Sequence, residues 1–361
     1  MLGGLERQIL DISENLSSRN HNVMVISLDS GELNSFYGRP EASKVVWRGL
    51  GIGSPNRKAN LKEKIKRQIK LIKIIRDFDP DVSVSFMIGA FIYSRLPHFI
   101  CRKTLILSER NSPDIYRLTS ANKYRYFYFF LMLFANRITV QFDSYRLKYP
   151  IFLRHKIISI PNSIVLNPNS QVHLKNKIPQ FIYAGRFSFQ KQLGKLIKIF
   201  VAYRNQGGKG NLALYGDGEA KEEILDLIKD LEATSYISIN PPANDMNKVF
   251  KQATYNCLFS MWEGFPNSLA EGLKFGIPAI GFENCDGVSD MIFNNFNGWL
   301  FTDDGNYSRI GGELLKLDDI NQKDFDKIII NCKASIAKYS DQVIFQKWID
   351  LFVSVKSSSL R

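Results

Sequence analysis

Short apolar runs alternate along the chain with longer segments whose apolar residues recur every three or four positions. Asn22–Leu28 (NVMVISL) and Val82–Phe86 are runs of the first kind, which is typical of strands in a parallel sheet. Leu5–Arg19 and Asn60–Asp77 are segments of the second kind, with the periodicity of helices that pack one face against a core. This alternation predicts an α/β fold with parallel sheets and right-handed crossovers.

The same rhythm continues to the end of the chain. In the first half we expect a helix over about Lys123–Ala135 and strands at Thr104–Ser108, Arg137–Gln141 and Lys156–Ile160. In the second half we expect strands at Phe181–Ala184, Asn211–Tyr215, Tyr236–Ile239, Tyr255–Phe259 and Pro278–Gly281. The helices expected between and after them cover Gln192–Arg204, Gly218–Leu231, Met246–Gln252, Asn267–Phe275, Val288–Phe293, Asn321–Lys338 and Gln342–Val355.

One segment interrupts this rhythm and divides the chain. Residues 165–179 are polar, contain two prolines and have no periodicity, so we expect a linker there. The domains would then span residues 1–164 and 180–340, and residues 341–361 would form a helix that packs back toward the first domain. Ligands of open α/β sheets bind at the carboxyl ends of the strands, so the cleft between the domains is the expected active site.

Composition narrows the range of partners. The chain has 48 Lys and Arg against 35 Asp and Glu, a net charge of +13, which indicates nucleic acid, an anionic membrane face or a phosphorylated substrate. Nothing resembles a nucleic-acid-binding motif, so no nucleic-acid partner is expected. The four cysteines are scattered without a C-x-x-C pair, and we expect reduced thiols and no metal site.

The N-terminal residues and the apolar runs bear on localisation. Met1–Gln8 lacks the apolar segment of a signal peptide, and no run of about 18 apolar residues predicts a membrane-spanning helix. We therefore expect a cytoplasmic protein.

Two carboxylates flank a helix start in the second half. Glu263 lies in the loop after an expected strand, and Glu271 lies one turn into the next helix. Asn267 could cap that helix, whose first amides would bind an anion. Ionised carboxylates accept hydrogen bonds from vicinal sugar hydroxyls. The spacing alone would also fit a surface helix with two solvated glutamates.

A second pattern follows the first strand of the second half. In Ala184–Lys191 (AGRFSFQK), Gly185 would let the backbone approach a ligand closely. Arg186 and Lys191 would neutralise a diphosphate and the charge that develops on a leaving group, although two exposed basic residues are the plainer alternative. Residues 216–219 (GDGE) follow the next strand and form a strand-to-helix turn.

These segments together resemble retaining glycosyltransferase family 4, whose members have the GT-B fold, two Rossmann-like domains facing a cleft. Residues 263–282 (EGFPNSLAEGLKFGIPAIGF) match the family's E-x7-E signature and the order of its following segments. Residues 185–191 resemble its G-R-x4-K element, with Gln192 in place of the usual glycine, and residues 285–292 and 297–298 extend the similarity. The resemblance covers nearly the whole chain.

The resemblance also implies roles for individual residues. Glu271 would bind the nucleotide ribose, Glu263 would lie by the donor sugar, and Arg186 and Lys191 would hold the diphosphate without a metal or other cofactor. The residues expected to be catalytic are Glu263, Arg186 and Lys191. The implied nucleotide-sugar site comprises Gly3, Gly4, Gly185, Arg186, Lys191, Gly216, Glu263, Gly264, Phe265, Pro266, Asn267, Ser268 and Glu271.

Two segments of the first half complete the resemblance. Gly3 and Gly4 resemble the family's glycine loop, which a strand precedes in other members, so we expect an N-terminal domain without its first strand. Residues 108–113 (SERNSP) resemble the corresponding segment in a branch of the family that is associated with the assembly of polysaccharides and lipid-linked oligosaccharides. The expected acceptor or sugar contacts are Glu109, Arg110 and Asn111.

Two further helices raise the question of a membrane. Arg57–Arg76 contains nine basic residues and an apolar stripe of Leu61, Ile65, Ile69 and Ile72. The stripe could be buried beneath a solvated basic face, or the helix could contact anionic lipid or pyrophosphate. The residues expected to make such contacts are Lys62, Lys66, Arg67 and Lys70. Tyr124–Phe134 (YRYFYFFLMLF) could be a core helix or an interfacial one.

The sequence therefore predicts a retaining glycosyltransferase of bacterial surface-polysaccharide or lipid-linked oligosaccharide synthesis, peripheral on the inner face of the cell membrane. It would move a sugar from a nucleotide donor, which we expect to be a UDP-sugar, to a glycan or lipid-linked glycan. One alternative is a GT-B epimerase or phosphorylase, although epimerases lack E-x7-E. Another is a non-catalytic protein that binds polyanions or membranes and has an incomplete N-terminal domain.

Overall fold

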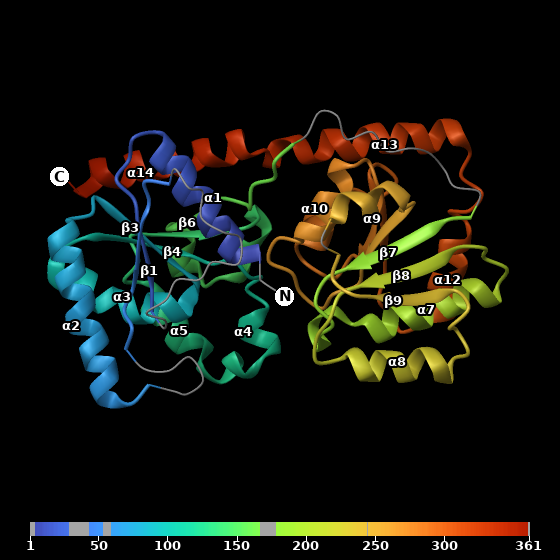
Figure 1. Cartoon of the computed structure of the whole chain (residues 1–361), viewed down its shortest axis with the longest axis horizontal. Helices are drawn as coiled ribbons and strands as arrows, with labels where there is room; N and C mark the ends of the chain where they lie inside the picture. The colour runs from blue at the N-terminus through green and yellow to red at the C-terminus, as the bar shows by residue number, and fades with distance from the viewer. Residues whose placement is uncertain (1–3, 29–42, 53–58, 167–177, 244, 360–361) are drawn as a thin grey trace. The chain divides into compact units, whose positions relative to one another are not determined.

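The structure is a computed structural model that describes residues 4–28, 43–52, 59–166, 178–243 and 245–359 (Figure 1). The chain divides into two compact units. The N-terminal unit comprises Leu2–Ser163 together with Gln342–Arg361, and the C-terminal unit comprises Ile164–Asp341. The last helix therefore groups with the first half of the chain. None of the helices in the described residues has both the length and the apolar character needed to cross a membrane.

Parallel strands form the sheets of the N-terminal unit. A four-stranded sheet has the order β3-β4-β5-β6, and β1 and β2 form a separate parallel pair. The strands are β1 (Met24–Ser27), β2 (Val46–Gly49), β3 (Val82–Phe86), β4 (Thr104–Ser108), β5 (Arg137–Val140) and β6 (Ile157–Ser159). The helices of this unit are α1 (Gly4–Ser18), α2 (Leu61–Phe78), α3 (Met87–Cys101), α4 (Ile115–Leu118), α5 (Arg125–Met132) and α6 (Ile151–Arg154), with the 3-10 turns η1 (Ser120–Tyr124) and η2 (Asp143–Lys148).

The core of this unit includes the end of the chain. Trp348 and Leu351 of α14 (Asp341–Ser359) are buried in one apolar cluster with Ile12 of α1 and Ile106 of β4. Full burial of such a side chain contributes about 1.5–3 kcal/mol. The apolar face of the last helix is therefore part of the N-terminal core.

Helix α2 begins and ends at defined signals but buries an unexpected face. Asn60 and Glu63 form a reciprocal capping box at its start, and Asp79 ends it in the left-handed conformation. Its buried residues are Arg67, Leu71, Ile74 and Ile75. The alternative in which Leu61, Ile65 and Ile69 form a buried stripe is wrong, because these side chains are 73%, 51% and 63% exposed.

The sequence patterns missed helix α3 and predicted α5 to be longer than it is. The segment of α3 is apolar on most sides and contains Pro97, so it lacks the amphipathic period that identifies a surface helix. The helix expected over Lys123–Ala135 is shorter, since η1 precedes α5 and α5 ends at Met132.

The C-terminal unit contains a parallel sheet whose six described strands follow the order β12-β11-β10-β7-β8-β9. The strands are β7 (Gln180–Ala184), β8 (Asn211–Tyr215), β9 (Ile237–Asn240), β10 (Tyr255–Leu258), β11 (Ala279–Phe282) and β12 (Gly298–Phe301). The helices are α7 (Leu193–Asn205), α8 (Lys221–Asp230), α9 (Met246–Gln252), α10 (Asn267–Lys274), α11 (Val288–Met291), α12 (Tyr307–Leu315) and α13 (Gln322–Ile336), with the 3-10 turns η3 (Phe189–Lys191) and η4 (Ala337–Tyr339). This is the strand order of a classical Rossmann sheet, with the direction of winding reversing between β7 and β10.

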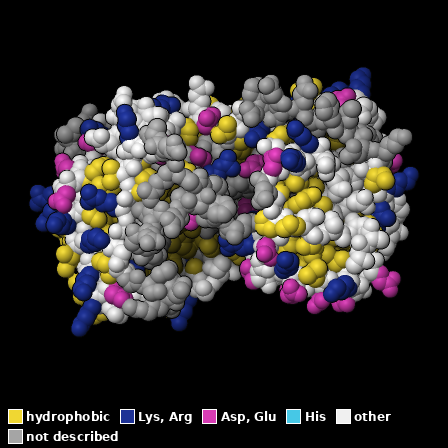
Figure 2. Space-filling view, in the orientation of Figure 1, with side chains coloured by type: hydrophobic (Ala, Val, Ile, Leu, Met, Phe, Trp, Pro, Cys, Tyr) yellow, Lys and Arg dark blue, Asp and Glu magenta, His cyan; other side chains and the backbone are white. Residues whose placement is uncertain are grey.

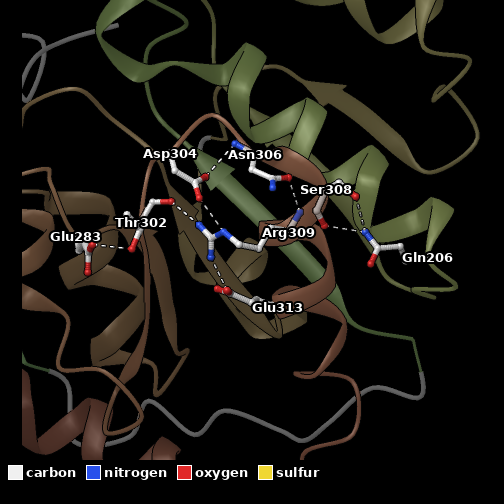
Figure 3. A network of polar contacts seen from close by, with 8 residues as sticks. All are labelled: Gln206, Glu283, Thr302, Asp304, Asn306, Ser308, Arg309 and Glu313. Atoms are coloured by element: carbon white, nitrogen blue, oxygen red, sulfur yellow. Dashed lines mark hydrogen bonds and ion pairs between the residues drawn. The ribbon is translucent and has the colours of Figure 1, made fainter.

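A polar network fixes the loop between β12 and α12 (Figure 3). Arg309 donates to Asp304 at 2.9 Å and to the carbonyl of Thr302 at 2.9 Å, and it also pairs with Glu313. Asn306 caps the helix by accepting from the amide of Arg309 at 3.0 Å. Exposed pairs of this kind contribute little individually, so the network mainly sets the conformation of the loop.

Candidate active site

The expected motifs of the second half lie at the point where the sheet reverses its winding. Residues 185–191 follow β7, and residues 259–266 follow β10. These two strands are hydrogen-bonded neighbours, with Tyr255 opposite Phe181. The crevice at the carboxyl ends of such a pair is where open α/β sheets bind their ligands. The fold therefore brings the two motifs together at one edge.

A buried ion pair joins the two motifs. The Nζ of Lys191 lies 2.6 Å from Oε1 of Glu263, and the two side chains are only 18% and 7% exposed. A charge-assisted hydrogen bond in such surroundings is stronger than one in water. Lys191 and Glu263, predicted separately as a phosphate ligand and a sugar ligand, are thus direct neighbours.

Hydrogen bonds between the two loops hold this pair in place. Gln190 donates from its side-chain amide to the carbonyl of Trp262 at 2.6 Å, and its own carbonyl accepts from the amide of Met261 at 2.9 Å. Tyr183, at the end of β7, donates its hydroxyl to the carbonyl of Arg186 at 2.8 Å. The sequence reading missed Tyr183 and Gln190, whose only signal is their position beside the motif. Arg186 itself is exposed.

Gln192, which stands where the resemblance leads us to expect a glycine, has a left-handed backbone conformation. Its φ is 48° and its ψ is 40°, the left-handed region that glycine occupies most readily. It stands directly before α7 and ends the turn that carries Lys191. A non-glycine residue in this conformation costs backbone strain of about 1 kcal/mol.

Gly216 lies where two backbones approach closely. A Cβ at this position would lie 1.9 Å from the carbonyl oxygen of Gly185 and 2.7 Å from the ring of Phe187. The loop after β8 therefore packs against the loop after β7 without room for a side chain.

The Gly216→Ala variant should accordingly be less stable by about 2 kcal/mol, because the loops must separate to admit the methyl group. The Gly194→Ala variant is the matched control, since its Cβ would meet the side chain of Leu227 at an ordinary 3.6 Å. Urea unfolding followed by circular dichroism measures both. Equal stability of the two variants would contradict the close packing described for Gly216.

Helix α10 begins at Asn267, the residue that was expected to precede and cap it. Asn267 is the first residue of the helix, and Pro266 precedes it without a side-chain cap. The expected capping role of Asn267 is thus corrected, and its amide donates to the carbonyl of Phe265 at 2.8 Å. Glu271 is half-buried one turn into the helix. Gly264, Phe265 and Pro266 are buried and Ser268 is half-buried.

Helix α10 also packs closely against β10. A Cβ on Gly272 would lie 2.5 Å from the side-chain amide nitrogen of Asn256, which donates to the carbonyl of Ser268 at 2.7 Å. This contact fixes the register of α10 on the sheet. It thereby sets where Glu271 lies relative to the loop that carries Glu263.

The expected contacts of the N-terminal unit are directed into its interior. Glu109 and Arg110 are only 1% and 7% exposed. Glu109 accepts from the hydroxyl of Tyr116 at 2.8 Å, and Arg110 donates to the carbonyl of Ile160 and to Asn162. Contact of these residues with a sugar or an acceptor stays a prediction, as it does for the half-buried Asn111.

Burial also perturbs the ionisation of Glu109. Desolvation raises the pKa of its carboxyl from 4.5 to about 7, although the hydroxyl of Tyr116 and the amide of Ile88 act in the opposite direction. Within the described residues, Oε1 of Glu109 and the hydroxyl of Tyr149 have no hydrogen-bond partner. The side chain thus holds a proton at physiological pH more readily than an ordinary glutamate.

The remaining predicted residues lie at the N-terminus and on α2, and they differ in their exposure. Gly4 begins α1, whereas Gly3 lies outside the described residues. Lys62 and Lys66 are exposed on α2, and Lys70 donates to the carbonyl of Leu50 at 2.6 Å. The expected membrane or pyrophosphate contact of Arg67 is corrected, because its guanidinium is buried and donates to the carbonyl of Ile52 at 2.7 and 2.9 Å.

The C-terminal sheet thus has the Rossmann strand order and carries the Lys191–Glu263 pair at the point where its winding reverses, which is where open α/β sheets bind their ligands. Residues 167–329 match the family model of the glycosyl transferases group 1. This region, which carries both motifs, is therefore similar to a group 1 glycosyl transferase domain.

Relatives over nearly the full chain agree with this. The chain is 25% identical over 369 residues to the amylovoran biosynthesis glycosyltransferase AmsD of Erwinia amylovora, which covers 97% of this chain and 95% of that protein. It is 23% identical over 373 residues to a Campylobacter jejuni enzyme, the GalNAc-alpha-(1->4)-GalNAc-alpha-(1->3)-diNAcBac-PP-undecaprenol alpha-1,4-N-acetyl-D-galactosaminyltransferase, with 99% and 96% covered.

A solved structure supports the fold. The structure of Anabaena Alr3699/HepE in complex with UDP superposes with a TM-score of 0.79 at 15% identity, covering 98% of this chain and 96% of that one. The expectation of an α/β fold with Rossmann-like parallel-sheet units of the GT-B type is thereby confirmed.

Proposed function

We propose that the chain is a retaining enzyme of glycosyltransferase family 4 that transfers a hexose or N-acetylhexosamine from a UDP-sugar to a glycan or lipid-linked glycan during bacterial surface-polysaccharide synthesis. The observation that carries the proposal is the buried pair of Lys191 and Glu263 at the switch point of the C-terminal sheet. The functions for which these relatives are named, amylovoran biosynthesis and transfer to an undecaprenol-linked glycan, support the acceptor class. The neighbour solved with UDP supports the nucleotide.

The proposed reaction breaks the bond between the anomeric carbon and the diphosphate oxygen and forms a bond to an acceptor hydroxyl on the same face of the sugar. Arg186 and Lys191 stabilise the negative charge on the departing diphosphate, which would otherwise require a metal. The diphosphate oxygen takes the acceptor proton. Glu263 accepts hydrogen bonds from the sugar hydroxyls, and Glu271 does so from the ribose. The backbone of residues 264–268 lies against the sugar and phosphates.

A panel of UDP-sugars tests this proposal. Release of UDP should occur with one donor and increase when a lipid-linked glycan acceptor is added, and EDTA should leave the rate unchanged. Proton NMR of the product should show the anomeric configuration of the donor retained. A stably folded protein that releases UDP from no donor would contradict the enzymatic proposal, and an inverted product would contradict retention.

A further inference from the structure

The excess of positive over negative charge lies in one of the two units. Residues 2–163 and 342–361 contain 29 Lys and Arg against 14 Asp and Glu, a net charge of +15. Residues 164–341 contain 19 Lys and Arg against 21 Asp and Glu, a net charge of −2. The unit that binds the nucleotide diphosphate in the proposed reaction is therefore not the one that carries the basic excess. That excess is available to a separate anionic partner.

Helix α2 exposes apolar and basic side chains on the same side. Leu61, Ile65 and Ile69 follow one another at four-residue intervals and are 73%, 51% and 63% exposed. Lys62 and Lys66 follow two of them directly and are also exposed. The opposite face of the helix is already packed in the unit. An apolar row bordered by lysines is the pattern of a helix that lies in a membrane interface.

The neighbouring helices continue the apolar surface. On α3, Phe99 is 74% exposed, and on α5, Tyr126, Phe127 and Phe130 are 71%, 55% and 55% exposed. Exposed apolar side chains that gather in one patch mark a site of interaction. The surface is thus apolar as well as basic.

Contacts between the helices show that these exposed groups belong to one region. Gln68 of α2 donates to the carbonyl of Tyr93 on α3 at 2.9 Å. The guanidinium of Arg95 on α3 lies 5.5 Å from the centre of the Phe134 ring, directly after α5, and that ring packs edge-on against Phe130. Helix α3 therefore bridges α2 and α5. In Figure 2, basic and hydrophobic side chains lie side by side over the α2 edge of the unit.

A basic pocket lies beside α2, next to strand β2. It lies between β2 and α2 and is lined by Arg48, Lys70 and Lys73, with Asp77 as its single acidic residue. The side chains of Arg48 and Lys73 are exposed. Such a pocket suits a phosphate headgroup beside a surface that holds acyl chains.

We propose that the exposed face of α2, α3 and α5 docks on an anionic lipid bilayer. Nucleic acid would pair with the lysines but would leave Phe99 and Ile69 in contact with water. An acidic bilayer satisfies both, because the aromatic and aliphatic side chains enter the headgroup boundary while the lysines meet lipid phosphates. Docking of this kind is shallow and requires no spanning helix. It is independent of the proposed transfer reaction and needs neither donor nor acceptor.

Co-sedimentation of the full chain with vesicles tests the proposal. Vesicles of phosphatidylglycerol and phosphatidylethanolamine should bind the protein, and vesicles of phosphatidylcholine alone should bind it at least tenfold more weakly. The triple variant Lys62→Gln, Lys64→Gln, Lys66→Gln should lose about fivefold in affinity per lysine. The triple variant Phe99→Ser, Tyr126→Ser, Phe130→Ser should lose at least tenfold at equal net charge.

Matched controls come from the C-terminal unit. Lys248→Gln with Lys251→Gln removes exposed lysines of α9, and Ile330→Ser removes an apolar side chain that is 68% exposed on α13. These variants should bind vesicles like the parent chain, and circular dichroism should show all variants folded. Binding that survives the aromatic substitutions would overturn the proposal, as would equal losses in the control variants. Equal binding to neutral and anionic vesicles would overturn it as well.

Discussion

Replacing Lys191 by alanine is expected to lower kcat/KM for sugar transfer by about 100- to 1,000-fold, the usual loss when one preorganised donor to a developing negative charge is removed. The Nζ of Lys191 is held 2.6 Å from Glu263 in a largely buried position. There it lies at the point where the sheet reverses its winding. Because its position is already fixed, it needs little reorganisation when charge develops on the diphosphate. The loss should appear in kcat and in UDP affinity, measured by UDP release and by calorimetry.

A control and two further variants distinguish charge stabilisation by Lys191 from mere positioning of Glu263. Lys229→Ala removes a lysine of α8 that is 67% exposed and should leave both quantities unchanged. The double variant Lys191→Met, Glu263→Gln removes both charges and keeps the approximate shapes. If Lys191 acts only by holding Glu263, the double variant should be no worse than Glu263→Gln alone. Activity of Lys191→Ala within threefold of the parent chain would contradict the assigned role.

Sequence patterns located this site because they follow from the architecture of the sheet. Glycine, arginine, lysine and glutamate were predicted after strands β7 and β10, and parallel strands present their carboxyl ends at one edge. Direct pairing of Lys191 with Glu263 could not be predicted in the same way. It depends on the loop-to-loop hydrogen bonds of Gln190, which no spacing rule encodes.

The N-terminal unit was less predictable because some of its apolar residues pack in the core and others are exposed. Periodicity identifies a stripe such as Leu61, Ile65 and Ile69, but it does not tell whether the stripe faces the core or the outside. In α2 the core side is taken by Leu71, Ile74 and Ile75, together with the stem of Arg67. Likewise, Glu109 in a polar motif was expected near a ligand, yet its carboxyl accepts from Tyr116 inside the unit.

That buried carboxyl should make the stability of the protein depend on pH. The folded state raises the pKa of Glu109 from 4.5 to about 7, chiefly by desolvation. The folded protein therefore binds more protons than the unfolded chain between these values, and stability falls as pH rises through that window. The contribution of Glu109 is fully present below about pH 4.5 and is lost above about pH 7. A shift of this size corresponds to about 3 kcal/mol.

The Glu109→Gln variant should lack this dependence, because the amide carbonyl can still accept from Tyr116 but carries no titrating proton. The free energy of unfolding, measured in urea from pH 5 to pH 8, should fall less steeply for the variant than for the parent chain. The difference isolates Glu109, since other groups titrate equally in both proteins. Tyr116→Phe removes the hydroxyl that lowers the pKa of Glu109, so the fall in stability should extend to higher pH. Parallel curves for the parent chain and Glu109→Gln would contradict this prediction, because they would show that folding does not raise the pKa of the Glu109 carboxyl.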